Sequence, residues 1–385
     1  MKKKILFCAT VDYHFKAFHL PYMKWFKEQG WIVDVVASGD MDLPYVDKKY
    51  CLPIQRSPFH LKNIKALLEL GNIIDQNSYD IVHCHTPMGG VLGRLASQKA
   101  RRKNTKVIYT AHGFHFCKGT PKKNWLIYYP IERFLSSFTD CLITINDEDY
   151  KIAKTRFKAK RITHVHGVGV NTDQFESLSE TNKSLLKKSF GYNPNDFLLF
   201  YAAEFNKNKN QQLLLQSLDL LKEKVPNTKL LLAGNGPLLE NCREMASDLG
   251  ITHMVDFLGF LNDVKEILPI CDVAVGSSLR EGLPVNIMEA MACGLPIVAS
   301  KNRGHSELVV DGDNGFVVDP GNTKLFSAKI LELYQSKELR TAMGKKSMER
   351  VKLYSLYEVK KEMIEIYSKY MMEDERSTTS QRTYI

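Results

Sequence analysis

The stretch that decides the fold is DVAVGSSLREGLPVNIMEAMACGLPIVAS, residues 272–300. Its apolar run Asp272–Gly276 predicts a buried strand, and Val285–Cys293 predicts a helix that ends at Gly294. A second apolar run, Pro296–Ser300, predicts another strand. A strand, a helix and a strand in this order are typical of a parallel sheet that is covered by helices.

The same alternation continues in both directions along the chain. The predicted strands of the first half are Lys4–Ala9, Ile32–Ala37, Asp80–His85, Lys106–Thr110, Asp140–Ile145 and Arg161–Val165. Those of the second half also include Phe197–Ala202, Thr228–Ala233, Met254–Leu258 and Gly315–Val318. Because 385 residues with 44% hydrophobic content can bury two cores, we predict an α/β protein with two Rossmann-like, doubly wound domains that face each other across a cleft.

The domain limits are predicted from changes in amino-acid composition along the chain. We place an acceptor-side domain at 1–180 and a nucleotide-binding domain at 181–350, with the polar segment Asn171–Phe190 as linker. A helix at 351–372 is expected to return to the first domain, and the polar residues 373–385 are expected to be disordered.

Localisation is predicted from what the chain contains. The apolar run after Lys2–Lys4 is short, and no stretch approaches the roughly 18–20 apolar residues that cross a bilayer. The eight cysteines include no CxxC pair, which favours reduced thiols. Residues 1–170 carry a net charge of +13 and the remainder −3, so the first half is expected to face an anionic partner unless the excess is only a solvated surface. We expect a cytoplasmic protein, with peripheral attachment to the inner face of the plasma membrane as the further option.

Two carboxylates mark the expected donor site. Glu281 precedes the helix that begins near Pro284, and Glu289 lies within it. Free amides at a helix start, with Gly282 beside them, suit a diphosphate. Glu289 lies about 7 Å further along the axis at 1.5 Å per residue, where a carboxylate can accept hydrogen bonds from two vicinal ribose hydroxyls.

This pair resembles the E-x7-E motif of the retaining glycosyltransferases of family 4, which have the GT-B fold. Four further segments match that family in order: GVGVNTDQF (Gly167–Phe175), KNKNQ (Lys207–Gln211), LLLAGNGP (Leu230–Pro237) and GHSELVVDGDNGFVV (Gly304–Val318). The resemblance covers about residues 1–372. It implies a hexosyl- or N-acetylhexosaminyl-transferase that uses a nucleotide-sugar, with UDP favoured, and that needs no cofactor and no metal.

The resemblance also implies residue roles. Glu281 contacts the donor sugar, Glu289 the ribose and Lys209 the diphosphate. The remaining expected donor-binding residues are Gly234, Asn235, Gly236, Phe260, Leu261, Arg280, Gly282, Leu283 and Pro284. One departure is Glu204, which stands where the family usually has an arginine, and Arg280 is a candidate to compensate. A second is the first loop, Ala9–His14, which lacks the usual glycine pair.

In the first domain, His112 follows a predicted strand and resembles the family histidine that lies beside the donor sugar. His85 and Thr86, in the segment HTPMGG, and His115, in AHGFHF, are expected on the acceptor side. This wording resembles bacterial exopolysaccharide and capsule transferases, which implies a polyprenyl-diphosphate-linked glycan acceptor and no nucleic acid. The alternate spacing of His83 and His85 would also permit a metal, but the family needs none.

The predicted helix Phe15–Gln29 carries five aromatic residues at helical spacing. Such a stripe usually packs in a core, and its alternative is an apolar face for a membrane-bound lipid.

Four other functions stay open at this point. They are a UDP-sugar 2-epimerase of the same fold, a non-catalytic nucleotide-binding protein, a metal-dependent single-domain transferase built on Asp40-Met41-Asp42, and a dinucleotide dehydrogenase. The last would need G-x-G-x-x-G, of which GNGPLLE supplies only the beginning.

Overall fold

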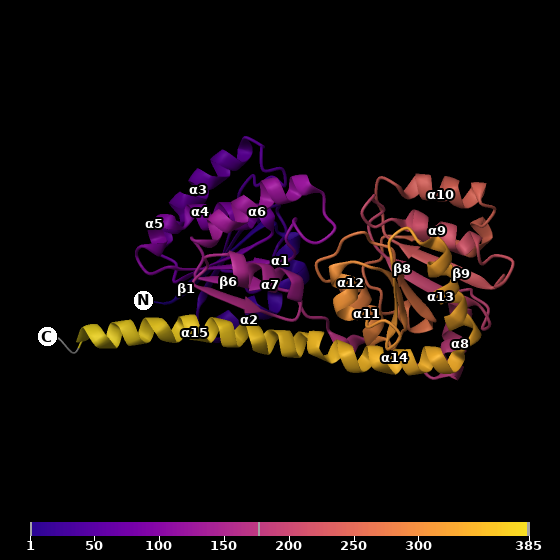
Figure 1. Cartoon of the computed structure of the whole chain (residues 1–385). Helices are drawn as coiled ribbons and strands as arrows, with labels where there is room; N and C mark the ends of the chain where they lie inside the picture. Colours follow the sequence, from indigo (N-terminus) through magenta and orange to yellow (C-terminus); the bar gives the residue numbers. More distant parts are fainter. Residues whose placement is uncertain (1, 176–177, 383–385) are drawn as a thin grey trace. The chain divides into compact units, whose positions relative to one another are not determined.

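The computed structural model describes residues 2–175 and 178–382, with side chains as far as Met371. It divides into two compact units, one of residues 1–169 with 357–385 and the other of residues 170–356. Each unit contains one all-parallel sheet (Figure 1). The two sheets confirm the predicted pair of Rossmann-like domains.

The first unit has a seven-stranded sheet of order β3-β2-β1-β4-β5-β6-β7. Its strands are β1 Lys4–Val11, β2 Ile32–Ser38, β3 Lys48–Cys51, β4 Ile81–His85, β5 Lys106–Ala111, β6 Cys141–Thr144 and β7 Arg161–His164. Its helices are α1 Tyr13–Phe18, α2 Leu20–Glu28, α3 Lys62–Asn77, α4 Pro87–Ala96, α5 Gln98–Arg101, α6 Lys122–Ser136, α7 Asp147–Arg156 and α15 Leu356–Arg382.

Alternate residues of β1 enter two different cores, because successive side chains of a strand point to opposite faces. Ile5 and Phe7 pack with α1, α2 and α15, whereas Leu6 and Cys8 pack with α3 and α4. The strand order reverses between β1 and β4, whose registers place Cys8 opposite Cys84. Ligands of such sheets bind beyond the carboxyl ends of the strands at this reversal.

The second unit has a six-stranded sheet of order β10-β9-β8-β11-β12-β13. Its strands are β8 Phe197–Ala202, β9 Thr228–Ala233, β10 Val255–Gly259, β11 Val273–Gly276, β12 Ile297–Ser300 and β13 Gly315–Val318. Its helices are α8 Glu180–Ser189, α9 Gln211–Asp219, α10 Leu239–Asp248, α11 Val285–Ala292, α12 Arg303–Leu308, α13 Thr323–Gln335 and α14 Lys337–Val351. Here the order reverses between β8 and β11.

Three details differ from the expected organisation. The segment expected as a linker contains α8, whose N-cap Ser179 accepts a hydrogen bond from the Asn182 amide and whose buried Lys187 bonds Asp272 at 2.9 Å. The first unit ends at Gly169, so the whole of that segment belongs to the second unit.

The single helix expected at Phe15–Gln29 is broken at His19, ahead of Pro21 in the first turn of α2. Phe15, Tyr22 and Phe26 are buried in the core, so the core interpretation of this stripe is correct.

The C-terminal helix α15 packs on the first unit. Val359, Met363, Ile366, Tyr367 and Tyr370 join the core that contains Phe7. Its backbone is helical through Arg382, where a disordered tail was expected from residue 373, because no glycine or proline interrupts the helix. Residues 383–385 lie outside the described residues. Among the described residues, no helix combines the length and the apolar character that a bilayer crossing requires.

Candidate functional site

The second unit has a pocket of about 410 Å³ at the carboxyl ends of β8, β9 and β10. The loop after each of these strands contributes residues, and α11 closes one side. The lining residues are Ala202, Ala203, Glu204, Ala233, Gly234, Asn235, Phe260, Leu261, Val264, Asn286 and Glu289. Five of the residues expected from the sequence, Gly234, Asn235, Phe260, Leu261 and Glu289, are therefore brought together here.

Two glycines of the loop after β9, both expected at the donor site, have positive φ values. Gly234 and Gly236 have φ values of 134° and 155°, a region that favours glycine. A Cβ on Gly234 would lie 2.1 Å from the Ala203 carbonyl oxygen, and one on Gly236 would lie 2.4 Å from that of Phe205. The glycines thus let the loop after β9 lie directly against the loop after β8.

Glu289 is the partly exposed carboxylate of this pocket. Burial, and then the nearby Asp263 carboxylate, raise its pKa to about 7. A carboxylate with such a pKa gains from ligand groups that donate hydrogen bonds to it. Asn286, one turn earlier, was not expected from the sequence; its amide donates to the Ala202 carbonyl at 2.8 Å and fixes α11 against the end of β8.

Beside the pocket, Lys209 and Glu281 form an ion pair. The Lys209 Nζ lies 2.6 Å from Glu281 Oε1, and the two side chains are 24% and 13% exposed. Lys209 follows β8 and Glu281 follows β11, so the pair sits at the reversal of strand order. The Ser277 hydroxyl also donates to the Lys209 carbonyl at 2.7 Å, which joins the two loops near the pair.

The loop that carries Glu281 is held from a second side. Asn302 caps α12 and donates to the Ser278 carbonyl at 2.8 Å, while Arg303 Nε donates to the Glu281 carbonyl at 3.0 Å. A Cβ on Gly304 would lie 2.9 Å from Glu281 Cβ, so α12 must approach here without a side chain. Arg303 was not predicted, because it lies one residue ahead of the matched segment Gly304–Val318 and its contact is to a backbone carbonyl of another loop.

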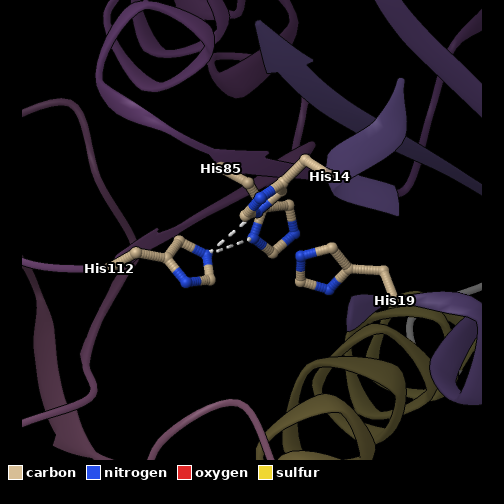
Figure 2. Close-up of side chains that lie close together, drawn as sticks. All are labelled: His14, His19, His85 and His112. Carbon is tan, nitrogen blue, oxygen red and sulfur yellow. Dashed lines mark hydrogen bonds between the residues drawn. The ribbon is translucent and has the colours of Figure 1, made fainter. Parts of the chain in front are cut away.

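In the first unit, four histidines gather at the other reversal of strand order. His14 lies on α1, His19 precedes α2, His85 ends β4 and His112 follows β5. One ring nitrogen from each lies within 4.8 Å of the others. Figure 2 shows the four side chains pointing toward one another. His112 and His85 were expected as site residues, whereas His14 and His19 were not.

Hydrogen-bond distances join three of these rings. His112 Nε2 lies 3.2 Å from His14 Nε2 and 3.4 Å from His85 Nδ1 (Figure 2). Burial lowers the pKa of His14 to about 4 and lowers those of His19, His85 and His112 well below the usual value, with smaller contributions from neighbouring histidines in the last three. At neutral pH the cluster is therefore uncharged.

Comparisons with known proteins show the family of the chain. Residues 4–146 match the family model "Glycosyl transferase 4-like" and residues 182–350 match "Glycosyl transferases group 1". A Bacillus subtilis protein, "Putative glycosyltransferase EpsD", is 50% identical over 96% of this chain and 98% of its own length. This chain is a family 4 glycosyltransferase.

Other relatives and solved structures show the same family and fold. An Escherichia coli protein named UDP-Gal:alpha-D-GlcNAc-diphosphoundecaprenol alpha-1,3-galactosyltransferase is 29% identical over 72% of each chain. Anabaena HepE, solved in complex with UDP and glucose, superposes with a TM-score of 0.77 at 20% identity and covers 96% of this chain and 100% of its own. The transferase thus has the GT-B fold. With a match in each half, the single-domain transferase and the dinucleotide dehydrogenase are set aside.

The remaining predicted residues of the transferase lie around the two sites. Pro284 is the N-cap of α11 and not in its first turn, and Leu283 beside it is buried. Glu204 is exposed and accepts a hydrogen bond from the Asn206 amide at 3.0 Å. Arg280 is also exposed, and its Nε donates to Asn208 Oδ1 at 3.2 Å.

On the first unit, Thr86 has a φ of 62° and its hydroxyl accepts from the Thr10 amide at 2.9 Å, so it ties the end of β4 to the end of β1. His115 is exposed and its ring packs near Tyr128, and it is outside the histidine cluster. His83 is also outside: its two nitrogens contact the hydroxyls of Tyr367 and Thr110.

Proposed function

We propose that this transferase moves a hexosyl or N-acetylhexosaminyl group from a UDP-sugar to a lipid-diphosphate-linked glycan in exopolysaccharide synthesis, with retention of anomeric configuration. The observation that carries the donor half is the pocket of the second unit, which contains the carboxylate of Glu289, together with the Lys209–Glu281 ion pair in the loops after β8 and β11. Ribose hydroxyls and a diphosphate are complementary to these two groups.

The donor is expected to lie along α11. In this arrangement the ribose bonds Glu289, and the uracil lies between the loops that carry Asn235 and Phe260, both of which line the pocket. The diphosphate then meets the amides at the start of α11, where Pro284 offers no side-chain cap. UDP as the nucleotide is supported by the name of the E. coli relative and by the UDP in the HepE structure.

Catalysis would consist of positioning and of stabilising the departing diphosphate. Lys209 and the start of α11 would carry its developing charge, Glu281 would bind the sugar, and His112 would orient a sugar hydroxyl or stabilise charge near the anomeric carbon. The departing phosphate oxygen is then a sufficient acceptor for the proton of the incoming hydroxyl.

The acceptor half is supported by two facts. The name of the E. coli relative includes a diphosphoundecaprenol-linked sugar, and residues 1–170 have a net charge of +13. This net positive charge would attract a lipid diphosphate or an anionic bilayer.

The proposal includes membrane attachment through one surface of the first unit. Large apolar side chains are exposed on α6 and on α3 with the residues before it, and α4 packs against both helices. These side chains are Phe59, Leu61, Ile64, Leu68, Leu126, Ile127, Ile131 and Phe134. Lys62, Lys65, Lys122, Lys123 and Arg133 are exposed on the same two helices, which is the combination that favours binding at an anionic interface.

The function is tested by incubating the purified chain with a panel of UDP- and GDP-sugars and lipid-linked acceptors, followed by mass spectrometry. We expect one UDP-sugar to give a glycosylated lipid, with the donor's anomeric configuration in the product spectrum by NMR. An epimerised donor in the absence of acceptor would favour an epimerase. Donor binding without turnover by any acceptor would favour the non-catalytic alternative.

Membrane attachment is tested with vesicles. The parent chain should sediment with anionic vesicles at low salt, and the double variant Leu126→Glu, Phe134→Glu should not. Leu220→Glu, at an exposed leucine of the second unit, is the matched control. Equal sedimentation of all three proteins would remove this surface from the proposal.

A further inference from the structure

The four-histidine cluster has a geometry that hydrogen bonding alone does not explain. His112 Nε2 lies close to nitrogens of both His14 and His85, at 3.2 and 3.4 Å. A neutral imidazole nitrogen has either one proton or one lone pair. His112 Nε2 can therefore satisfy both contacts only by sharing that single group between them.

The other rings are also short of partners. His19 is 4% exposed and neither of its nitrogens has a hydrogen-bond partner, and Nε2 of the fully buried His85 has none either. A buried polar nitrogen without a hydrogen-bond partner is destabilising. A metal ion binds one nitrogen of each ring, so it would give a partner to one of the two unpaired nitrogens of His19.

Two of the nitrogen–nitrogen distances match those of a metal site, and one nitrogen from each ring lies within 4.8 Å of the others. Zinc binds histidine nitrogen at about 2.0–2.1 Å, and a tetrahedron of such bonds has edges of about 3.3 Å. The two short nitrogen separations, 3.2 and 3.4 Å, lie on either side of that value. A small cavity of about 20 Å³, lined in part by His19, His85 and His112, adjoins the cluster, and about 10–15 Å³ is enough for a water-sized occupant.

We propose that His14, His19, His85 and His112 form a binding site for one divalent transition-metal ion of the zinc class. All four ligands are imidazoles, and Asp, Glu and Cys are absent from the cluster among the described residues. Such a set suits Zn²⁺, Co²⁺, Ni²⁺ or Cu²⁺, whereas Mg²⁺, Ca²⁺ and Mn²⁺ prefer oxygen ligands.

The surroundings indicate an exchangeable ion. Tightly held metals are supported by hydrogen bonds to the second nitrogen of each histidine. His85 lacks such a bond at Nε2, and His19 at whichever nitrogen remains free. We therefore infer that the ion binds reversibly. While it is bound, it coordinates His112 and inhibits turnover. Only this inhibition depends on the proposed role of His112 in catalysis; metal binding does not.

The experiment measures metal binding without donor or acceptor. Tag-free protein is titrated with Zn²⁺ against a chromophoric chelator and with Co²⁺ by visible absorption. We expect one ion per chain with the absorption of a four-coordinate nitrogen site. His14→Gln, at a position of intermediate exposure, should weaken the affinity at least tenfold, and His19→Gln should do the same if it folds.

Two control variants exclude adventitious sites. His60→Gln removes an exposed histidine and Cys51→Ser removes the exposed cysteine, and both should bind like the parent. An absence of stoichiometric binding, or equal affinity in parent and His14→Gln, would overturn the proposal. In the assay, Zn²⁺ should abolish turnover and EDTA should restore it. Full turnover at saturating Zn²⁺ would exclude His112 as a ligand, while leaving the proposed transferase function intact.

Discussion

The Lys209 ammonium lies 2.6 Å from the Glu281 carboxylate, across the reversal of strand order in the second unit. The resemblance assigns the two residues to different parts of the donor, the diphosphate and the sugar. In the free protein the Lys209 ammonium and the Glu281 carboxylate therefore neutralise each other. Binding of a donor must redirect the lysine to the phosphate, so the pair affects affinity and turnover in different ways.

Substitutions at this pair should separate the two effects. Lys209→Gln removes a phosphate ligand, and we expect about a tenfold weaker UDP affinity, or 1.4 kcal/mol, and about 10²-fold lower kcat. Glu281→Gln releases the lysine for the phosphate, so UDP should bind as tightly as in the parent or more tightly while kcat falls. Calorimetry and steady-state kinetics measure both, with Lys207→Gln in the same loop as control. A parallel loss of UDP affinity in the two variants would contradict this account.

Glu289 should make donor binding depend on pH. Its pKa of about 7 means that the carboxylate is protonated as pH falls below 7, and only the ionised form accepts from both ribose hydroxyls. Affinity for a UDP-sugar should fall from pH 8 to pH 6, and Glu289→Gln should flatten the profile. A UDP-sugar is used because it lacks the terminal phosphate that titrates near pH 6.

The same raised pKa affects folding with the opposite sign. The folded state binds the proton more tightly than the unfolded chain, so this contribution to stability is present below about pH 4.5 and is lost as pH rises through about 7. Chemical denaturation of parent and Glu289→Gln across this range measures it. A parent that loses no stability relative to the variant as pH rises would show that the pKa is not raised.

His112 should be needed for turnover but not for UDP binding, because the pocket proposed for UDP consists of residues of the second unit. We expect His112→Asn to lower kcat about 10²-fold with the Kd for UDP unchanged. His60→Asn, at an exposed histidine of the same unit, is the control. Wild-type turnover in His112→Asn would place the catalytic role elsewhere.

Breaking a buried ion pair should destabilise the first unit. Arg94 is fully buried, and its guanidinium makes two hydrogen bonds to Glu132, at 2.8 and 3.1 Å, beneath the Tyr109 ring. Glu132→Ala leaves an unpaired buried charge and should cost about 3–5 kcal/mol. Arg94→Met combined with Glu132→Leu should recover most of that loss in urea denaturation. A double variant as unstable as Glu132→Ala would mean that packing, and not charge, sets the cost.

Most of the fold could be predicted because buried parallel strands have a strong apolar signal. Phe197–Ala202, Thr228–Ala233 and Gly315–Val318 were predicted with the bounds that the structure gives. The edge strand β3 was missed because its sequence, KKYC, is half charged. Helix α8 was not predicted because its sequence is as polar as that of a linker. Its tertiary contact, between the buried Lys187 and Asp272, cannot be read from the local sequence.

The residues proposed for the donor site could be selected from the sequence, since strand-end loops and a glutamate pair can be recognised there. Asn286 and Arg303 were not, because their contacts are to backbone carbonyls in other loops. The complete histidine cluster could not be predicted from the sequence either. Its members come from four segments between residues 14 and 112, and only the sheet order brings those segments together.

The sequence by itself determined the fold class, the family and the positions of Glu281 and Glu289, because local apolar periodicity and motif spacing are properties of the chain. Tertiary structure decided three further matters: the pairing of Lys209 with Glu281, the raised pKa of Glu289, and the meeting of His14 and His19 with His85 and His112. Each depends on distance and burial between residues that are far apart in sequence or shielded by other elements. Spacing along the chain does not encode these quantities.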